Sequence, residues 1–393
     1  MTFFWRSQFH PHEGFTVVEL LMAMVVMLAV TGATFALMNP TEGVFAAQGE
    51  VSDMQQRLRV AVETLHKDLM MAGAGSDAGS AVGALGNFVP PLVPYRVGAT
   101  SGDPGGTFRT NVVSLVYAPP KAAQAAIGDP MVSSAVPVRV NPRPGCPVGD
   151  ELCGFDERMT LMIFDDTGTF DIFKVAGVEK SALWLRHQGT GVSKIYAQGS
   201  SIVQVVTPSY WLKTDTLTET YQLMRYDGWE TDLPIADHVV GLHFEYFGEG
   251  QAAQLRPLES PPTTYGPRPP RLGEPNPPWP DGENCAFVIS GGQQVPRMET
   301  LGPANGPLIT IDEAQLTDGP WCPSYTASNR WDVDLLRIRR IRVTLRVQVA
   351  TTGLRGAAGA LFTHAGTSPG AERFIPDQEI RFDVTPRNMN LGR

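Results

Sequence analysis

Glu19 has the most unusual chemical environment of the ionisable residues, because it is the one charge in the 24-residue apolar stretch Phe15–Met38. A carboxylate inside a membrane costs on the order of 3 kcal/mol or more unless it is paired or neutralised. A simple membrane anchor does not need such a group. Glu19 therefore either pairs with a cation or lies near the membrane surface, where it reaches water.

The four cysteines are too few for a disulfide scaffold but are compatible with two bridges in an oxidising compartment. We expect Cys146 to pair with Cys153 and Cys285 to pair with Cys322, because each bridge would then close one loop. Three pairings are possible for four cysteines. A zinc site is the alternative, but the sequence offers neither C-x-x-C spacing nor a nearby pair of histidines.

Three aspartates, Asp165, Asp166 and Asp171, are candidates for calcium ligands because calcium prefers oxygen ligands. The segment Asp165-Asp166-Thr167-Gly168 also has the residues of a hairpin turn between two apolar runs. We expect the turn rather than a metal site.

No motif predicts catalysis. The chain has no H-E-x-x-H, G-x-S-x-G or G-x-x-x-x-G-K-[ST] pattern, and its seven histidines are scattered. The formal net charge of −9 also argues against a dedicated nucleic-acid-binding protein. A basic strip is formed by Arg337, Arg339, Arg340, Arg342 and Arg346. Such a strip could bind phosphates, but we expect it to be the solvated face of a strand. We expect no enzyme activity, no cofactor and no nucleic-acid partner.

The element that contains Glu19 is long enough to cross a membrane. At about 1.5 Å per residue, a helix over Phe15–Met38 would extend about 36 Å, against about 30 Å for the hydrocarbon core. A cleaved secretory signal has a shorter apolar region with a small-residue cleavage site after it. No A-x-A-like site follows this stretch before the polar segment. We therefore expect the helix to be retained as an anchor.

The residues at the start of this helix, Gly14-Phe15-Thr16-Val17-Val18-Glu19-Leu20-Leu21, resemble the class III signal of type IV pilins and type II secretion pseudopilins. In that family a prepilin peptidase cuts after the glycine, and the new N-terminal phenylalanine is methylated. The resemblance implies that residues 1–14 are a leader peptide and that cleavage between Gly14 and Phe15 is followed by N-methylation of Phe15. Glu13 departs from the pattern, because a basic residue often precedes the glycine.

The resemblance also implies a role in assembly for Glu19. The new α-amine of Phe15 would be a cation at the edge of an apolar helix, one turn away from the carboxylate. In a filament of packed helices, Glu19 of one subunit can neutralise the amine of a neighbour. Such a pair fixes the register between subunits, as a lone polar residue does in a coiled coil.

The helical pattern continues beyond the apolar stretch. Gly32 and Pro40 interrupt it, and we expect the helix to bend or break near them. Apolar residues then recur at spacings of three and four, which predicts an amphipathic helix with one buried face and a helical region over residues 15–75. The last part of this helical region resembles the L-x-x-D-L/I-R-x-A-G segment of PilW-type minor pilins and J-type pseudopilins. The matching residues are Leu65, Asp68, Leu69, Ala72 and Gly73.

Residues 76–393 are expected to form a β-rich head, because short runs of β-branched and aromatic residues recur there. The resemblance to pilins implies that this head is periplasmic. In Ile341–Val349, apolar residues alternate with arginines and other polar residues, which predicts a strand with one buried face. Two stretches, about 119–157 and 251–333, fall outside the resemblance to PilW-type minor pilins and are expected to be loop insertions. We predict an α+β, pilin-like fold, with a long N-terminal helix packed on a mainly antiparallel β head.

By this resemblance, the chain is a minor pilin of a type IV pilus that acts in priming or assembly of the filament. It would be a single-pass inner-membrane protein before it is incorporated into a pilus at the cell surface. Its expected partners are other minor and major pilins, prepilin peptidase and the inner-membrane assembly machinery. One alternative is a J-type pseudopilin of type II secretion. The other is a pilus-tip adhesin or ligand-binding module that uses the two insertions.

Overall fold

The computed structural model describes residues 14–75, 85–100, 102–143, 145–165, 167–189, 191–215, 220–250, 287–290, 293–296, 307–319, 321–322, 330–355 and 375–389. The chain forms two compact units, which we describe separately. The first unit comprises residues 1–54 and 349–376, and the second comprises residues 55–348 and 377–393. All described strands belong to the second unit.

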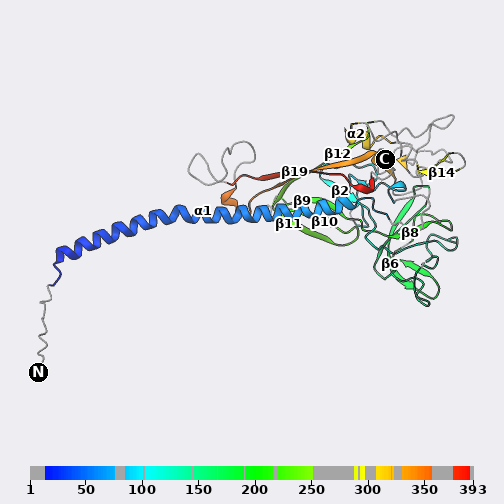
Figure 1. Cartoon of the computed structure of the whole chain (residues 1–393), viewed down its shortest axis with the longest axis horizontal. Helices are drawn as coiled ribbons and strands as arrows, with labels where there is room; N and C mark the ends of the chain where they lie inside the picture. The colour runs from blue at the N-terminus through cyan, green and yellow to red at the C-terminus, as the bar shows by residue number, and fades with distance from the viewer. Residues whose placement is uncertain are drawn as a thin grey trace, which may run out of the picture. The chain divides into compact units, whose positions relative to one another are not determined.

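Helix α1 (Val17–Met71) has 55 residues and is the first element of the described chain (Figure 1). Gly32 and Pro40 lie inside α1, so the helix does not end where the sequence pattern is interrupted. A proline removes one backbone hydrogen bond, and the turns on both sides keep theirs. In the first unit, the side chains of residues 17–35 are exposed throughout. Farther along α1, Glu50 accepts hydrogen bonds from the Ala350 amide and the Thr351 hydroxyl.

In the second unit, the last four turns of α1 bury one face against the head. Ala61, Leu65 and Leu69 are all fully buried, as the spacing of apolar residues predicts. The helix ends at Met71, and Gly73, two residues later, has a φ of +74° in the left-handed region that favours glycine. The Gly73 amide then donates to the carbonyl of Val116, which ties the end of the helix to the head.

Two antiparallel sheets form the part of the head around α1. The first has the order β1-β2-β9-β10-β11, and its strands are β1 (Leu92–Val93), β2 (Val112–Leu115), β9 (Ser209–Asp215), β10 (Thr220–Tyr226) and β11 (Asp232–Asp237). The second has the order β15-β12-β18-β19, and its strands are β15 (Ile309–Ile311), β12 (Val239–Gly248), β18 (Ile338–Val347) and β19 (Gln378–Val384). In β18, Ile341, Val343, Leu345 and Val347 are fully buried, so the predicted alternation is confirmed.

Six further strands close into a small barrel. Their order is β3-β8-β5-β6-β7-β4, and they are β3 (Gln124–Ala126), β4 (Val138–Arg139), β5 (Thr160–Phe164), β6 (Phe170–Glu179), β7 (Trp184–His187) and β8 (Ser201–Gln204). An antiparallel bridge between Ile127 and Val140 joins the two outer strands and closes the ring. Side chains fill the barrel, among them the fully buried Leu161, Leu185 and Tyr196.

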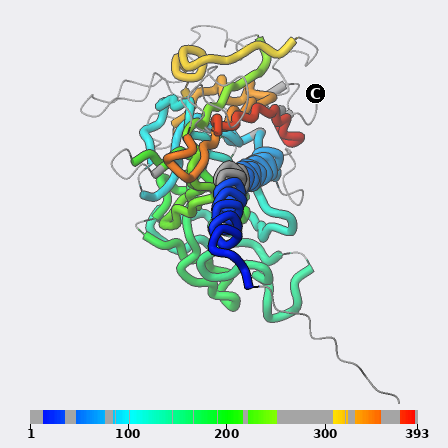
Figure 2. Tube along the Cα trace, turned by 90° about the vertical axis from the view of Figure 1, so that its left-hand side faces the viewer, coloured from blue at the N-terminus to red at the C-terminus, as the bar shows by residue number. Residues whose placement is uncertain are grey.

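A second apolar cluster joins the barrel to the rest of the head. Phe88 and Val116 from the head pack in it with Met162, Phe164 and Val203 from the barrel. In Figure 2, the green barrel strands and the red strand β19 lie on opposite sides of the light-blue, C-terminal part of α1. The barrel therefore shares an apolar cluster with the rest of the head and is not a separate domain.

The stretch 119–157 differs from our expectation of a loop insertion, because it supplies β3 and β4 of the barrel. These strands have three and two residues, which is too short to give a periodic pattern in the sequence. The described part of the other expected insertion, 251–333, contains short elements. They are β13 (Phe287–Ser290), β14 (Gln293–Pro296), β15, the four-residue helix α2 (Glu313–Leu316), β16 (Trp321–Cys322) and β17 (Trp331–Asp332). Its proline-rich part, 257–280, lies outside the described residues.

Candidate functional site

The first turn of α1 brings Thr16 and Glu19 together in a capping box. The Thr16 amide and hydroxyl both donate to Glu19 Oε2, at 2.9 and 3.0 Å, and the Glu19 amide donates back to the Thr16 hydroxyl at 3.3 Å. This arrangement satisfies two backbone amides that have no partner inside the helix. The helix dipole also favours a carboxylate in this turn. Glu19 thus has a structural partner in its own chain.

Gly14 and Phe15 precede this capping box and are open to solvent. Phe15 is 88% exposed, and a Cβ added at Gly14 would meet no atom within 4 Å. Residues 17–35 of α1 are apolar and long enough to cross a membrane, and none of these side chains is buried. The bond between Gly14 and Phe15 is therefore accessible at the end of an exposed apolar helix.

Asp68 fixes the end of α1 to the head through a buried hydrogen-bond network. Its carboxylate accepts from the Tyr117 hydroxyl at 3.0 Å, from the Tyr210 hydroxyl at 2.7 Å and from Arg225 Nε at 3.0 Å. Asp68 is 5% exposed. Burial and the charge of Asp68 raise the pKa of both tyrosines, so both stay protonated as donors.

The calcium candidates Asp165 and Asp171 are engaged by donors of the protein. Asp165 accepts from the Thr167 amide and forms an ion pair with Lys194. Asp171 Oδ2 accepts from the amide and hydroxyl of Ser193 and from the Tyr196 hydroxyl. Asp166 lies outside the described residues. These contacts connect the β5–β6 turn and the start of β6 to the segment that contains Lys194 and Tyr196.

Cys146 and Cys153 form a disulfide in the segment between β4 and β5 of the barrel. Their Cα atoms are 5.6 Å apart, and the loop between them contains the fully exposed Val148. Cys322 is disulfide-bonded as well, and its expected partner Cys285 lies outside the described residues. Among the described cysteines, none has a free thiol.

The basic strip does not form one exposed face. Arg337 and Arg339 are 2% and 3% exposed and donate to the backbone carbonyl and the carboxylate of Glu249, respectively. The solvated strand face expected for these two arginines is therefore wrong. Arg342 pairs with Asp383 at 2.7 Å, so acidic neighbours neutralise the strip on its more exposed side as well.

Three carboxylates that the sequence analysis did not single out, those of Asp318, Asp332 and Asp334, lie within 4.8 Å of one another. The carboxylate of Asp332 accepts from the Gly319 amide at 2.7 Å and the Asp334 amide at 2.9 Å, and Asp334 pairs with Arg337. Burial raises the pKa of Asp332 to about 7, and the neighbouring carboxylates add to this shift. These contacts assign the cluster a structural role at the end of β17.

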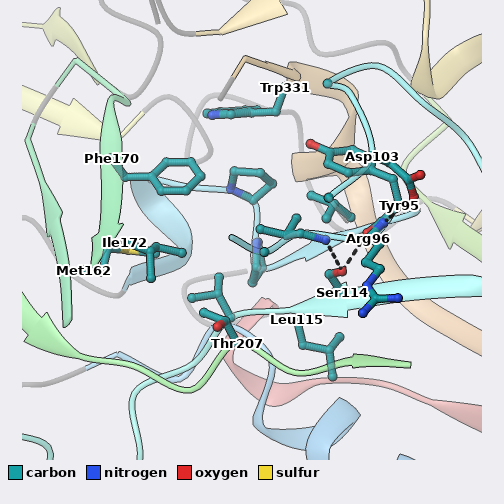
Figure 3. Close-up of a pocket in the computed structure, with 18 of the residues that line it drawn as sticks. Tyr95, Arg96, Asp103, Ser114, Leu115, Met162, Phe170, Ile172, Thr207 and Trp331 are labelled. Carbon is teal, nitrogen blue, oxygen red and sulfur yellow. Dashed lines mark hydrogen bonds between the residues drawn. The ribbon is translucent and has the colours of Figure 1, made fainter. Parts of the chain in front are cut away.

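A cavity of about 190 Å³ lies in the head and was also missed by the sequence analysis. Figure 3 shows Phe170, Ile172 and Met162 of the barrel on one side of it, and Trp331 and Tyr95 of the head on the other. The lining residues are far apart in the sequence, so no local pattern could have indicated this cavity.

No protein-family model matches the chain, and neither the curated proteins nor the solved structures contain a match to it.

Proposed function

We propose that this protein is a minor pilin of a type IV pilus that acts in priming or assembly of the filament. The observation that carries the proposal is the start of α1. An accessible Gly14–Phe15 bond precedes a helix whose residues 17–35 are apolar, exposed and long enough to cross a membrane. Glu19 is the one acidic residue in its first turn.

Cleavage before Phe15 would leave this anchor in the mature chain. It would also create an α-amine next to Thr16, which precedes the first helical residue, Val17. The cation of one subunit and the Glu19 carboxylate of another would then be complementary where apolar helices pack together. In this mechanism, the assembly machinery moves the helix out of the inner membrane, and helix packing and charge pairing replace its contacts with lipid.

The architecture of the second unit supports the same proposal. The buried Asp68 network ties the end of α1 to the sheet that contains β9 and β10, so a pull on the helix is transmitted to the head. Asp68 belongs to the segment that resembles the PilW-type minor pilins. The expected partners are other pilins, prepilin peptidase and the assembly machinery of the inner membrane, with the head on the periplasmic side.

The test is the intact mass of the mature chain, isolated from membranes and from sheared filaments of cells that express Gly14→Ala and wild-type protein. We expect the wild-type chain to begin at N-methylated Phe15, and the variant to keep its leader, because the cleavage motif requires glycine. Gly49→Ala is the matched control, since an added Cβ meets no atom within 4 Å at either glycine.

Two results would contradict the proposal. Normal processing of Gly14→Ala would show that the motif at the start of α1 is not a prepilin cleavage site. A processed wild-type chain that is absent from sheared filaments, but present in membranes with the type II secretion machinery, would favour a J-type pseudopilin.

A further inference from the structure

We infer that the cavity in the head binds a small aromatic molecule with a single ring and a hydrogen-bond acceptor. This inference does not depend on the proposed function, because all of its evidence comes from the second unit. The cavity lies where the barrel meets the rest of the head, and its described lining includes Pro91, Tyr95, Met162, Phe170, Ile172 and Trp331.

The size of the cavity sets an upper limit on the ligand. A dry apolar cavity of about 150 Å³ in another protein accommodates benzene. The present cavity of about 190 Å³ is slightly larger. Pockets for drug-sized ligands start at about 300 Å³. One aromatic ring with a short substituent therefore matches the space, and a fused or multi-ring ligand exceeds it.

The side chains that line the cavity favour an aromatic ring over an aliphatic group. Phe170, Tyr95 and Trp331 present rings, and aromatic pairs contribute about 0.5–1.5 kcal/mol beyond the area that they bury. Met162 adds a thioether, which also makes favourable contacts with aromatic rings. The labelled side chains of the two walls face each other across the cavity in Figure 3.

Trp331 is the reason that we expect a hydrogen-bond acceptor on the ligand. The residue is 1% exposed, and its indole Nε1–H has no hydrogen-bond partner among the described residues. A buried donor without a partner costs about 1–3 kcal/mol. In Figure 3, the indole lies over the cavity, and its nitrogen is at the end nearest Phe170. A carbonyl or hydroxyl oxygen on the ligand would satisfy this donor.

Three polar side chains of the described lining already have partners within the protein, so we expect a ligand acceptor to be recognised by Trp331 rather than by them. Ser114 Oγ accepts from the Val97 amide at 3.0 Å and donates to the Tyr95 carbonyl at 2.6 Å. Arg96 is paired with Asp232 at 2.9 Å. Asp103, likewise in the lining, is paired with Arg109 at 2.6 Å.

The test compares two probes of the same shape. Acetophenone has a carbonyl acceptor, and α-methylstyrene has a methylene group in its place. Binding to the full-length protein in detergent is measured by ligand-observed NMR, with protein-free detergent as the blank. We expect both probes to saturate the site, and acetophenone to bind about 2- to 10-fold more tightly, which corresponds to one net hydrogen bond.

Three variants locate the binding. Trp331→Phe keeps a ring but removes the donor, so the preference for acetophenone should fall to about 1-fold. Trp321→Phe is the matched control, because the Trp321 indole is equally buried, has no hydrogen-bond partner in the described part of the chain either, and is not in the described lining of the cavity. Ile172→Trp fills the cavity from strand β6 and should abolish saturable binding of both probes. Near-UV circular dichroism checks that each variant is folded.

The inference is overturned if neither probe shows saturable binding to the folded wild-type protein, or if binding persists in folded Ile172→Trp. It is also overturned if Trp331→Phe and Trp321→Phe change the preference for acetophenone equally. If Ile172→Trp does not fold, the comparison between the two tryptophan variants decides the question without it.

Discussion

The carboxylate of Glu19 has a partner in its own chain, and under the proposed function it gains a second one in a neighbouring subunit. Thr16 binds it in the capping box, and the α-amine of Phe15 would bind it in a filament. These two roles require different properties of the side chain. A capping box works with glutamate or glutamine, whereas pairing with an amine requires the negative charge.

Substitutions at the two positions separate these roles. Glu19→Gln keeps the capping oxygen and removes the charge, so we expect normal cleavage but poor incorporation into filaments. Thr16→Val removes the hydroxyl at a cost of about 1 kcal/mol to the helix and should incorporate normally. The measurement is the amount of each chain in sheared filaments relative to membranes. Normal incorporation of Glu19→Gln would remove the proposed role of the charge.

Asp332 predicts a pH dependence of stability. Its folded-state pKa of about 7 is above the ordinary value of 3.8 because the carboxyl is buried. Its contribution to the unfolding free energy is therefore fully present below about pH 4 and is lost as the pH rises through about 7. We expect Asp332→Asn to reduce the fall in Tm between pH 5 and pH 8, measured by thermal unfolding.

The matched control is Asp383→Asn. Hydrogen bonds from Arg342 lower the pKa of Asp383, so this group is ionised in both states over the same range and contributes no slope between pH 5 and pH 8. Equal pH slopes for Asp332→Asn and the wild-type protein would contradict the assignment of the raised pKa to Asp332.

At the scale of elements, the buried Asp68 network determines how the C-terminal half of α1 is held on the head. Asp68→Ala would leave Arg225 and two tyrosine hydroxyls without their acceptor. Removal of one partner of a buried ion pair costs about 3–5 kcal/mol. Tyr210→Phe removes one hydrogen bond to the same carboxylate and should cost about 1 kcal/mol.

Chemical denaturation in detergent measures both effects, and Tyr221→Phe is the matched control. Tyr221 lies on β10, next to the β9 strand that carries Tyr210, but it is only partly buried. The described hydrogen bonds to Asp68 come from other residues. We expect its substitution to change the unfolding free energy by less than about 0.5 kcal/mol. Similar losses for Tyr210→Phe and Tyr221→Phe would show that the network does not hold the helix.

The elements that the sequence predicts well have sustained periodic patterns. The apolar start of α1, the buried stripe that ends at Leu69 and the alternation in β18 each extend over enough residues to give a clear period. The strands of the barrel have two to ten residues, and β3 and β4 are too short for any pattern. Barrel closure depends on contacts between residues that are distant in the chain, which no local pattern encodes.

At the scale of the whole molecule, the sequence predicts an apolar N-terminal helix and a mainly antiparallel β head, and both are present. The division of the head into two sheets and a barrel was not predictable. The same is true of the cavity, whose walls come from residues near 95, 170 and 331. Of the site residues, Asp68 appeared within a motif, but its buried partners could not be identified before the strands were placed.

The connection between the barrel and the rest of the head has a consequence for how such a head can change in evolution. The chain enters the barrel after Tyr117 and returns at Val206, and these two residues face each other as an antiparallel bridge. Strands β2 and β9 on either side pair directly with each other. A chain without the intervening residues would keep the same strand order and need only a tight turn. The barrel is thus one continuous segment that can be gained or exchanged between two paired strands, and one wall of the aromatic cavity would be exchanged with it.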